Sequence, residues 1–175
     1  MRYNQDGVCN NFLECVSNNC PSNNSNCLMW RDSRPEIICE ENNIKYRLFN
    51  NEAYISSKYH VDGQLMNGEN KKCDYMLINI KGENCKVIFV ELKGKDVQTA
   101  IEQIDSTYKQ LKSHLRGLCN VKFYGRIILS RFSLNAHTSS SDLKFARMFN
   151  EINREKNKKY GIIKSKLLEE KISDL

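Results

Sequence analysis

Two apolar runs near the middle of the chain, Cys73–Ile80 and Lys86–Lys93, have the alternation typical of β-strands. The polar residues around Gly82 separate them, which is the composition of a tight turn. The pattern therefore predicts an antiparallel hairpin. Side chains alternate between the two faces of a strand, so Glu91 and Lys93 are expected to point the same way at the end of the second strand.

Residues 97–115 carry apolar side chains at the spacing of one helix face. Asp96 is placed to cap the start of this helix, and Gly117 marks its end. Residues 121–129 then form a strong strand pattern. A strand, a helix and a further strand make a right-handed crossover, so the last strand is expected to lie parallel to the one that holds Glu91.

The remaining segments have less regular patterns, and their helices and strands are predicted from the same spacing of apolar residues. We expect an α/β fold with a central mixed β-sheet flanked by helices, in the order α-β-β-β-α-β. The chain divides into a Cys- and Asn-rich segment 1–35, a core 36–133, and a loop with basic helices, 134–175, that packs on the core. The further predicted elements are a helix over Glu36–Ile44, strands over Lys45–Phe49 and Ala53–Val61, a loop over Asn135–Ser141, a helix capped by Ser141 or Asp142, and a surface helix over Ile162–Ile172.

Charge is distributed unevenly along the chain. Residues 1–43 have three arginines against six acids, whereas residues 44–141 have fifteen lysines and arginines against nine acids. The excess of positive charge thus accompanies the central hairpin, as a phosphate-binding surface requires, although a solvated lysine-rich surface has the same composition. The first residues are polar and no apolar run is long enough to span a membrane, so a cytoplasmic protein without a membrane partner is expected.

Several cysteines lie near the start of the chain. Their spacing lacks the tight C-x-x-C arrangement of zinc ribbons, and no histidine is close in sequence. A structural zinc ion or an iron–sulfur cluster is one interpretation, and small buried hydrophobic side chains are the other. The cysteines concerned are Cys9, Cys15, Cys20, Cys27 and Cys39.

Asp74, Glu91 and Lys93 are the candidates for chemistry. An acid and a lysine at the end of the most apolar strand are costly to bury unless they are paired or bind a metal ion. The neighbouring strand brings Asp74 to the same end. Two carboxylates can hold Mg²⁺, and an ammonium group can stabilise the charge that develops during phosphodiester hydrolysis. The alternative is a surface ion pair, with Asp74 as a turn residue.

The arrangement resembles the PD-(D/E)XK nuclease superfamily, in which an Asp on one strand is followed by a hydrophobic strand ending in Glu-x-Lys, a helix and another strand. Cys73-Asp74 and Glu91-Leu92-Lys93 fit this pattern, with Cys in place of the Pro of the family name. The resemblance covers roughly residues 36–129 and implies a restriction-endonuclease-like core and a Mg²⁺-dependent nuclease, with Mn²⁺ as a substitute.

The resemblance also implies roles for single residues. Asp74 and Glu91 would bind the metal ion, with the backbone carbonyl of Leu92 as a further ligand. Lys93 would be the catalytic lysine. Gln103 on the following helix would be an additional catalytic residue, and Glu40 is a weaker candidate for an acid on the first helix.

DNA is the expected partner, although RNA is not excluded, and a homodimer would suit cleavage of both strands. A non-catalytic module that binds nucleic acid or protein on the same fold is the alternative function. The main candidates for contacts with DNA phosphates are Lys95, Lys109, Lys112 and Arg126, and further candidates are Arg116, Lys122 and Arg131.

Overall fold

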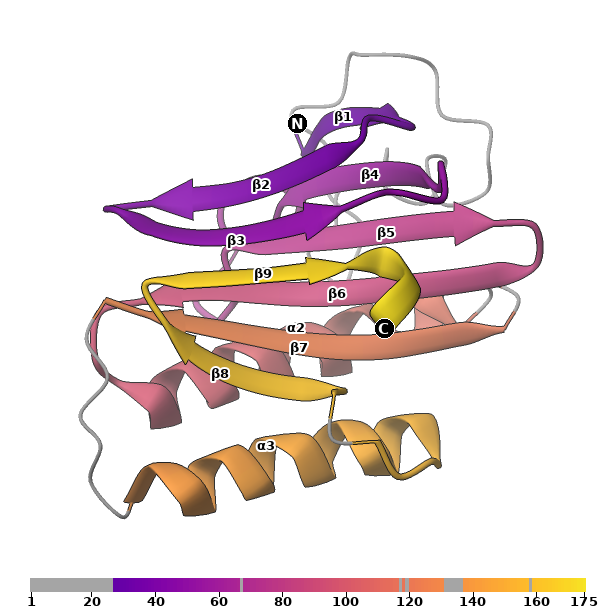
Figure 1. Cartoon of the computed structure of the whole chain (residues 1–175). Coiled ribbons are helices and arrows are strands. Elements are labelled where there is room, and N and C mark those ends of the chain that lie inside the picture. The colour runs from indigo at the N-terminus through magenta and orange to yellow at the C-terminus, as the bar shows by residue number, and fades with distance from the viewer. Residues whose placement is uncertain (1–26, 67, 117, 119, 131–136, 158) are drawn as a thin grey trace.

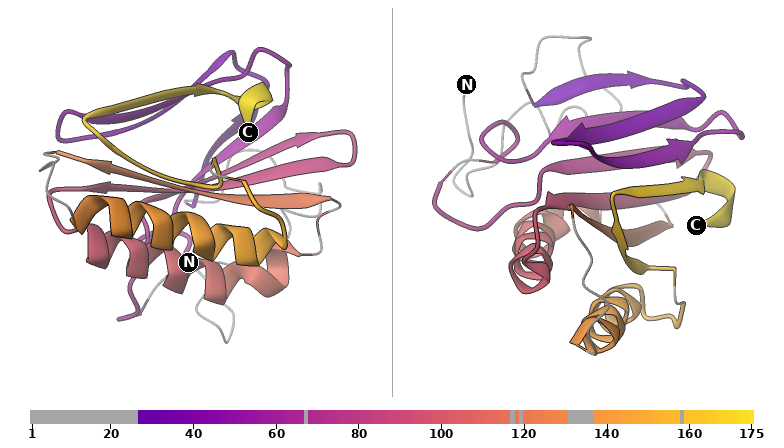
Figure 2. Two further views of the ribbon diagram at one scale, coloured as in Figure 1. Left: turned by 60° about the horizontal axis from the view of Figure 1, so that its bottom comes forward. Right: turned by 60° about the vertical axis from the view of Figure 1, so that its left-hand side comes forward.

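The computed structural model has a mixed α/β fold with three layers. It describes residues 27–66, 68–116, 118, 120–130, 137–157 and 159–175. Figures 1 and 2 show a six-stranded sheet in the middle, with a three-stranded sheet on one face and two helices of the described chain on the other. The predicted class, a mixed sheet flanked by helices, is confirmed at this level.

The large sheet has the strand order β1-β4-β5-β6-β7-β8. It is antiparallel from β1 to β6 and parallel from β6 to β8, so the predicted hairpin and the predicted parallel crossover are both confirmed. Its strands are β1 (Leu28–Asp32), β4 (Ile55–His60), β5 (Tyr75–Lys81), β6 (Asn84–Lys93), β7 (Val121–Leu129) and β8 (Gly161–Ser165).

Helix α2 (Val97–Leu115) has the predicted bounds, and the side chain of Asp96 accepts a hydrogen bond from the N–H of Thr99 as its N-cap. It lies on β6 and β7, whereas α3 (His137–Asn153) lies on β7 and β8. Helix α3 begins within the stretch that the sequence predicts to be a loop, so its predicted start was several residues too late.

Glycine at position 125 on β7 allows α3 to approach the sheet closely. A Cβ atom at this position would lie only 2.3 Å from a ring atom of Phe149. Gly161 on β8 has the same role, because its Cβ atom would lie 2.8 Å from the carbonyl oxygen of Phe145. The close approach of α3 to the sheet thus depends on two glycines, which have no side chain.

The small sheet corrects the predicted helix over Glu36–Ile44. This segment forms β2 (Glu36–Glu41) and the start of β3 (Ile44–Phe49), which pair as an antiparallel hairpin. Asn42 and Asn43 join them with positive φ angles of 49° and 62°, the conformation that two-residue hairpin turns require. The expected helix–strand order α-β-β-β-α-β therefore fails at its first element.

The predicted surface helix over Ile162–Ile172 is also wrong. This stretch contains most of β8 and the whole of β9 (Leu167–Lys171), with Lys166 between them at a φ of 60°. Strand β9 pairs in parallel with β3 and completes the small sheet, and the short 3-10 helix η1 (Ile172–Asp174) follows. No helix of the described residues is long and apolar enough to cross a membrane.

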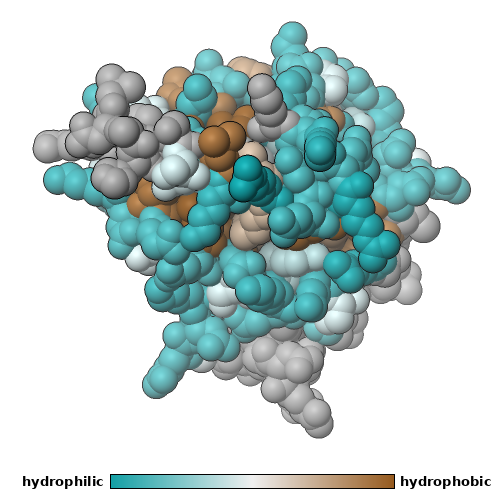
Figure 3. Space-filling model, turned by 90° about the horizontal axis from the view of Figure 1, so that it is seen from below, coloured by the Kyte–Doolittle hydropathy of each residue, from teal (hydrophilic) through white to brown (hydrophobic). Residues whose placement is uncertain are grey.

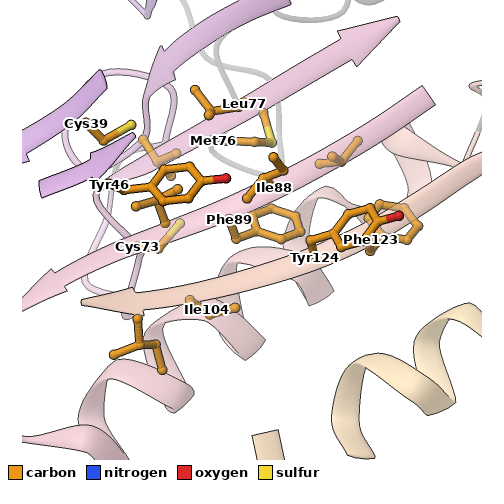
Figure 4. Packing of buried hydrophobic residues seen from close by; sticks show 14 of the residues in the cluster. Cys39, Tyr46, Cys73, Met76, Leu77, Ile88, Phe89, Ile104, Phe123 and Tyr124 are labelled. Carbon is orange, nitrogen blue, oxygen red and sulfur yellow. The ribbon is translucent and has the colours of Figure 1, made fainter. Parts of the chain in front are cut away.

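The large sheet is apolar on both faces because each face is covered. Phe89 on β6 stacks with Phe123 on β7, and Tyr108 of α2 meets both rings edge-on. The opposite face packs against β3, which contributes Tyr46 (Figure 4). Strand β6 therefore has buried side chains on both of its faces. Glu91 and Lys93 at its end are the exception to its apolar composition there.

Candidate functional site

The end of β6 and the start of β5 bring Asp74 beside Glu91. Tyr75 pairs with Val90 at the end of the antiparallel register, and Asp74 and Glu91 are the next residues beyond this pair. The N–H of Asp74 donates to Oε2 of Glu91 at 3.2 Å, and the N–H of Leu92 donates to Oδ2 of Asp74 at 2.7 Å. Each carboxylate thus accepts a backbone hydrogen bond from the other strand, which fixes the position of both.

Lys93 lies on the same side as Glu91, as strand alternation predicts. Its Nζ is 3.8 Å from Oε1 of Glu91, and the lysine side chain is 31% exposed while that of Glu91 is 1% exposed. The ammonium group therefore stands between a buried carboxylate and solvent. With both carboxyls ionised, Lys93 balances only one of the two negative charges.

Burial dominates the protonation of this cluster. It raises the pKa of Asp74 to about 6, although the hydrogen bond from Leu92 acts in the opposite direction. Burial also raises the pKa of Glu91 to about 8, the negative charge of Asp74 adds to this effect, and Lys93 opposes it. Two carboxyls that are hard to ionise side by side have the electrostatic character of a functional site.

Gln103 and Thr107 of α2 hold the strand that carries Asp74. The Nε2 group of Gln103 donates to the carbonyl of Lys72 at 2.8 Å, and Oγ1 of Thr107 accepts from the N–H of Cys73 at 2.9 Å. The Oε1 atom of Gln103 is buried and has no hydrogen-bond partner among the described residues. Gln103 thus lies behind the cluster and contacts its backbone.

Glu41 and Asp62 are two acids outside the predicted set of site residues. Each has a negative charge that contributes to the raised pKa of Asp74, and Glu41 also affects Glu91. The signal that points to Glu41 is the Asn42-Asn43 turn, which places the end of β2 at this edge. Glu40, the predicted candidate, instead pairs with Lys45 at 3.1 Å.

The predicted DNA-contacting residues fall in different places. Lys95 is exposed two positions after Lys93. Lys109 and Lys112 are exposed on the last turns of α2, and Lys109 pairs with Asp105 at 2.6 Å. Arg126 is fully buried between the two sheets, so the prediction that it contacts DNA is wrong.

The further candidates for phosphate contacts also lie in different places, and their role stays a prediction. Arg116 donates to the hydroxyl of Tyr108 at 3.0 Å, and Lys122 forms an ion pair with Glu155. Arg131 lies outside the described residues.

In the described parts of the chain, no three His, Cys, Asp or Glu side chains lie close enough together to form a metal-binding group. Asp74 and Glu91 are only two ligands, and this fits an ion that takes its other oxygens from water and substrate, as Mg²⁺ does. The carbonyl of Leu92 stays a predicted ligand. Of the cysteines considered for zinc, Cys9, Cys15 and Cys20 lie outside the described residues, and Cys27 and Cys39 are buried.

Two hollows of the described surface lie away from this cluster. One of about 670 Å³ lies between α2 and α3 and is lined by side chains such as Ile101, Leu143 and Arg147. Apolar surface is visible among hydrophilic side chains when the molecule is viewed from the helix side (Figure 3). No perturbed carboxyl pair lines this hollow, so we place the candidate site at the strand ends on its chemistry.

No protein-family model, no curated protein and no solved structure matches the chain.

Proposed function

We propose that the protein is a metal-dependent nuclease that hydrolyses phosphodiester bonds of DNA at the Asp74, Glu91 and Lys93 cluster. One observation carries the proposal: a carboxylate just before β5, a carboxylate near the end of β6 and one ammonium group lie together at one end of the hairpin. An ion pair with a purely structural role would balance its charges, whereas this cluster retains one negative charge when both carboxyls are ionised.

Asp74 and Glu91 are the residues that would hold a Mg²⁺ or Mn²⁺ ion. The ion would supply charge neutralisation and Lewis acidity at a phosphoryl oxygen. The raised pKa values of the two carboxyls support this assignment, because a divalent cation stabilises the ionised forms that burial disfavours.

Lys93 would act on the substrate side of the cluster. Its ammonium group is partly exposed and held near Glu91, so it can donate hydrogen bonds to a phosphate oxygen or orient a water molecule. Gln103 would be a positioning residue, because it contacts the backbone at Lys72 and would act through Asp74.

The arrangement of elements agrees with the resemblance to the PD-(D/E)XK superfamily in part. An antiparallel hairpin, a helix over it and a parallel strand follow one another as that pattern requires. The pattern has a helix before the hairpin, where this chain has the strands β2 and β3. A restriction-endonuclease-like core therefore remains part of the proposal.

The test compares wild type with Lys93→Ala on supercoiled plasmid, linear duplex and single-stranded DNA, and on RNA, with Mg²⁺ or Mn²⁺. We expect wild type to cut DNA and the variant to be slower by roughly 10²–10³-fold, the usual effect of losing one electrostatic stabiliser. The matched control is Lys81→Ala, at the opposite end of the same hairpin, where Lys81 pairs with Glu52 at 3.2 Å.

Each outcome separates the possibilities. If wild type cuts no substrate, the proposed activity is wrong, and binding of DNA without cleavage would favour the non-catalytic module. If Lys93→Ala and Lys81→Ala both cut like wild type, the activity lies at another site. Cleavage of RNA alone would retain the site and change the substrate.

A further inference from the structure

The end of the molecule that carries the candidate site has an uneven distribution of charge. We call it the charged edge, and it comprises residues 40–45, 61–62, 74, 91–95, 129–130 and 164–166. Figure 1 shows the turns β2–β3 and β8–β9 on the same side as the ends of β6 and β7, at the left. Both sheets therefore contribute to this edge.

Acids occupy one half of the charged edge. In the large sheet, Asp62 follows β4 and Asp74 precedes β5. In the small sheet, Glu40 and Glu41 end β2, which lies against β4 through a hydrogen bond of 2.7 Å from Lys58 Nζ to a β2 carbonyl. The two sheets thus place their acids on the same side of Glu91.

Lysines occupy the other half of the charged edge, beyond Lys93. Lys164 ends the row of strands on β8, and Lys166 forms the β8–β9 turn. Lys95 follows β6. The charge therefore changes from negative to positive across the end of both sheets, with Lys93 at the boundary.

Backbone hydrogen bonds join the lysine half to the candidate site. The N–H of Ser130 donates to the carbonyl of Lys93 at 2.9 Å, and the N–H of Lys166 donates to the carbonyl of Leu129 at 2.8 Å. Lys166 is thus two strand spacings, roughly 10 Å, from the end of β6. That distance suits a phosphate one or two nucleotides away from a phosphate held at Lys93.

The lysines of this half are available to a ligand. Lys95, Lys164 and Lys166 are exposed, and none of them forms an ion pair with a described residue. Lys164 is within electrostatic reach of Asp142 on α3. In contrast, Lys109 on α2 is already paired with an acid.

We propose that the lysine half of the charged edge, Lys95, Lys164 and Lys166, binds the sugar-phosphate backbone of the nucleic-acid strand on one side of the bond that is cut. The inference rests on the proposed function and adds the path of the substrate. The strand would leave the candidate site across the ends of β7 and β8, two strands that contain no acid. The described acids near this path are Asp96, which follows Lys95, and Asp142. The acid half, in contrast, would repel the same backbone.

The alternative path along α2 is less suitable. Lys109 and Lys112 are exposed on that helix, but at 1.5 Å per residue they lie roughly 18 Å or more along it from Val97. Helix α2 runs back from the charged edge toward the start of β7, because β6 and β7 are parallel. These two lysines are therefore near the opposite end of the molecule and serve as an internal control.

The experiment compares the full-length variant Lys164→Glu/Lys166→Glu with Lys109→Glu/Lys112→Glu, which has the same change of charge. Binding of a labelled DNA oligonucleotide is followed by fluorescence anisotropy with Ca²⁺ in place of Mg²⁺, at several salt concentrations. We expect the first variant to bind DNA at least tenfold more weakly than wild type. In a plot of the logarithm of the binding constant against the logarithm of the salt concentration, the size of its slope should fall by roughly 1.5–2. The control is expected to bind within about twofold of wild type, since its lysines contact no phosphate.

The outcomes distinguish this inference from the proposed function. If wild type binds and cuts DNA while Lys164→Glu/Lys166→Glu binds equally well, the substrate path is wrong and the nuclease stands. A larger loss in the α2 variant also overturns the path. If wild type neither binds nor cuts, both proposals fail. Should the double glutamate variant unfold on thermal melting, Lys164→Gln/Lys166→Gln is measured in its place, with a smaller loss of the same sign expected.

Discussion

Two clusters of buried charge, one between the sheets and one at their edge, differ in how completely they are compensated. Between the sheets, Arg126 donates from Nε to Oε1 of Glu170 at 2.6 Å and from an NH2 group to Oε2 at 3.1 Å. The hydroxyl of Tyr46 donates to the same carboxylate at 2.6 Å. At the edge, the ammonium group of Lys93 is 3.8 Å from Glu91, and its positive charge also acts on Asp74.

The difference supports the proposal that the first cluster serves structure and the second serves chemistry. The Arg126–Glu170 pair joins β7 of the large sheet to β9 of the small sheet, and its geometry is bidentate, so its charges are satisfied within the fold. The edge cluster has two carboxyls with raised pKa values and an open side. This shortage of positive charge supports the proposed binding of a cation there.

The largest expected effect is the loss of the satisfied pair. Arg126→Ala leaves Glu170, which is 12% exposed, without its guanidinium partner. Removing one partner of a buried ion pair typically costs about 3–5 kcal/mol of unfolding free energy. The measurement is urea denaturation followed by circular dichroism.

A double variant, Arg126→Met/Glu170→Leu, tests the reason for that loss. Because it removes both charges, it is expected to recover most of the stability that the single variant loses. If the single variant unfolds like wild type, the pair does not hold the two sheets together.

At the edge cluster, a substitution is expected to raise the free energy of unfolding rather than lower it, and by a smaller amount. A carboxyl with a higher pKa in the folded protein than in the unfolded chain stabilises the fold below the unfolded pKa, and this contribution disappears as pH rises through the folded pKa. For Glu91, stability is lost in the window between pH 4.5, the ordinary pKa of the group, and about pH 8, its pKa in the folded protein. Metal-free wild type should therefore lose stability between these values, and Glu91→Gln should lose less and be more stable at the upper end by roughly 1–3 kcal/mol.

Urea denaturation at a series of pH values, with a chelator present, measures this effect. Addition of Mg²⁺ at the upper end of the window should stabilise wild type and leave Glu91→Gln unchanged, because the amide is a poorer ligand than the carboxylate. If the unfolding free energies of the two proteins change with pH in parallel, the pKa of Glu91 is not the one that causes the loss of stability.

The smallest expected effect belongs to an exposed ion pair. Lys122 and Glu155 are in contact on the surface, with side chains that are 41% and 52% exposed. Lys122→Ala should change the unfolding free energy by about 0.2–1 kcal/mol, and high salt should reduce even that difference. A loss as large as that of Arg126→Ala would remove the distinction between buried and exposed charges on which the comparison rests.

The spacing of apolar residues was sufficient to predict the elements whose pattern is long and depends only on neighbouring residues. The hairpin of β5 and β6, helix α2 and strand β7 lie where the sequence predicts them, and the crossover has the predicted parallel register. These elements bring Asp74, Glu91 and Lys93 together because the hairpin fixes the first two and strand alternation fixes the third.

The errors arose where non-local pairing decides the structure. Leu167-Leu168-Glu169-Glu170-Lys171 has helical composition, yet it forms β9 because β3 offers it a parallel partner. Ser33 and Pro35 are typical of a helix start, yet Ile37 and Cys39 alternate as strand residues because β2 pairs with β3. Arg126 was predicted to be on the surface because the sequence did not reveal the second sheet that covers it.

The position of β9 has a consequence for how the fold is reached. Its contact residue Glu170 is 124 positions from Tyr46, so the small sheet closes only when distant parts of the chain meet. Until then β3 has an open edge that can pair with another chain. Contacts of this range form slowly, whereas a tight hairpin forms early from neighbouring residues. The strands that carry the candidate site thus belong to the fast, local part of folding, and the addition of β9 to the small sheet belongs to the slow part.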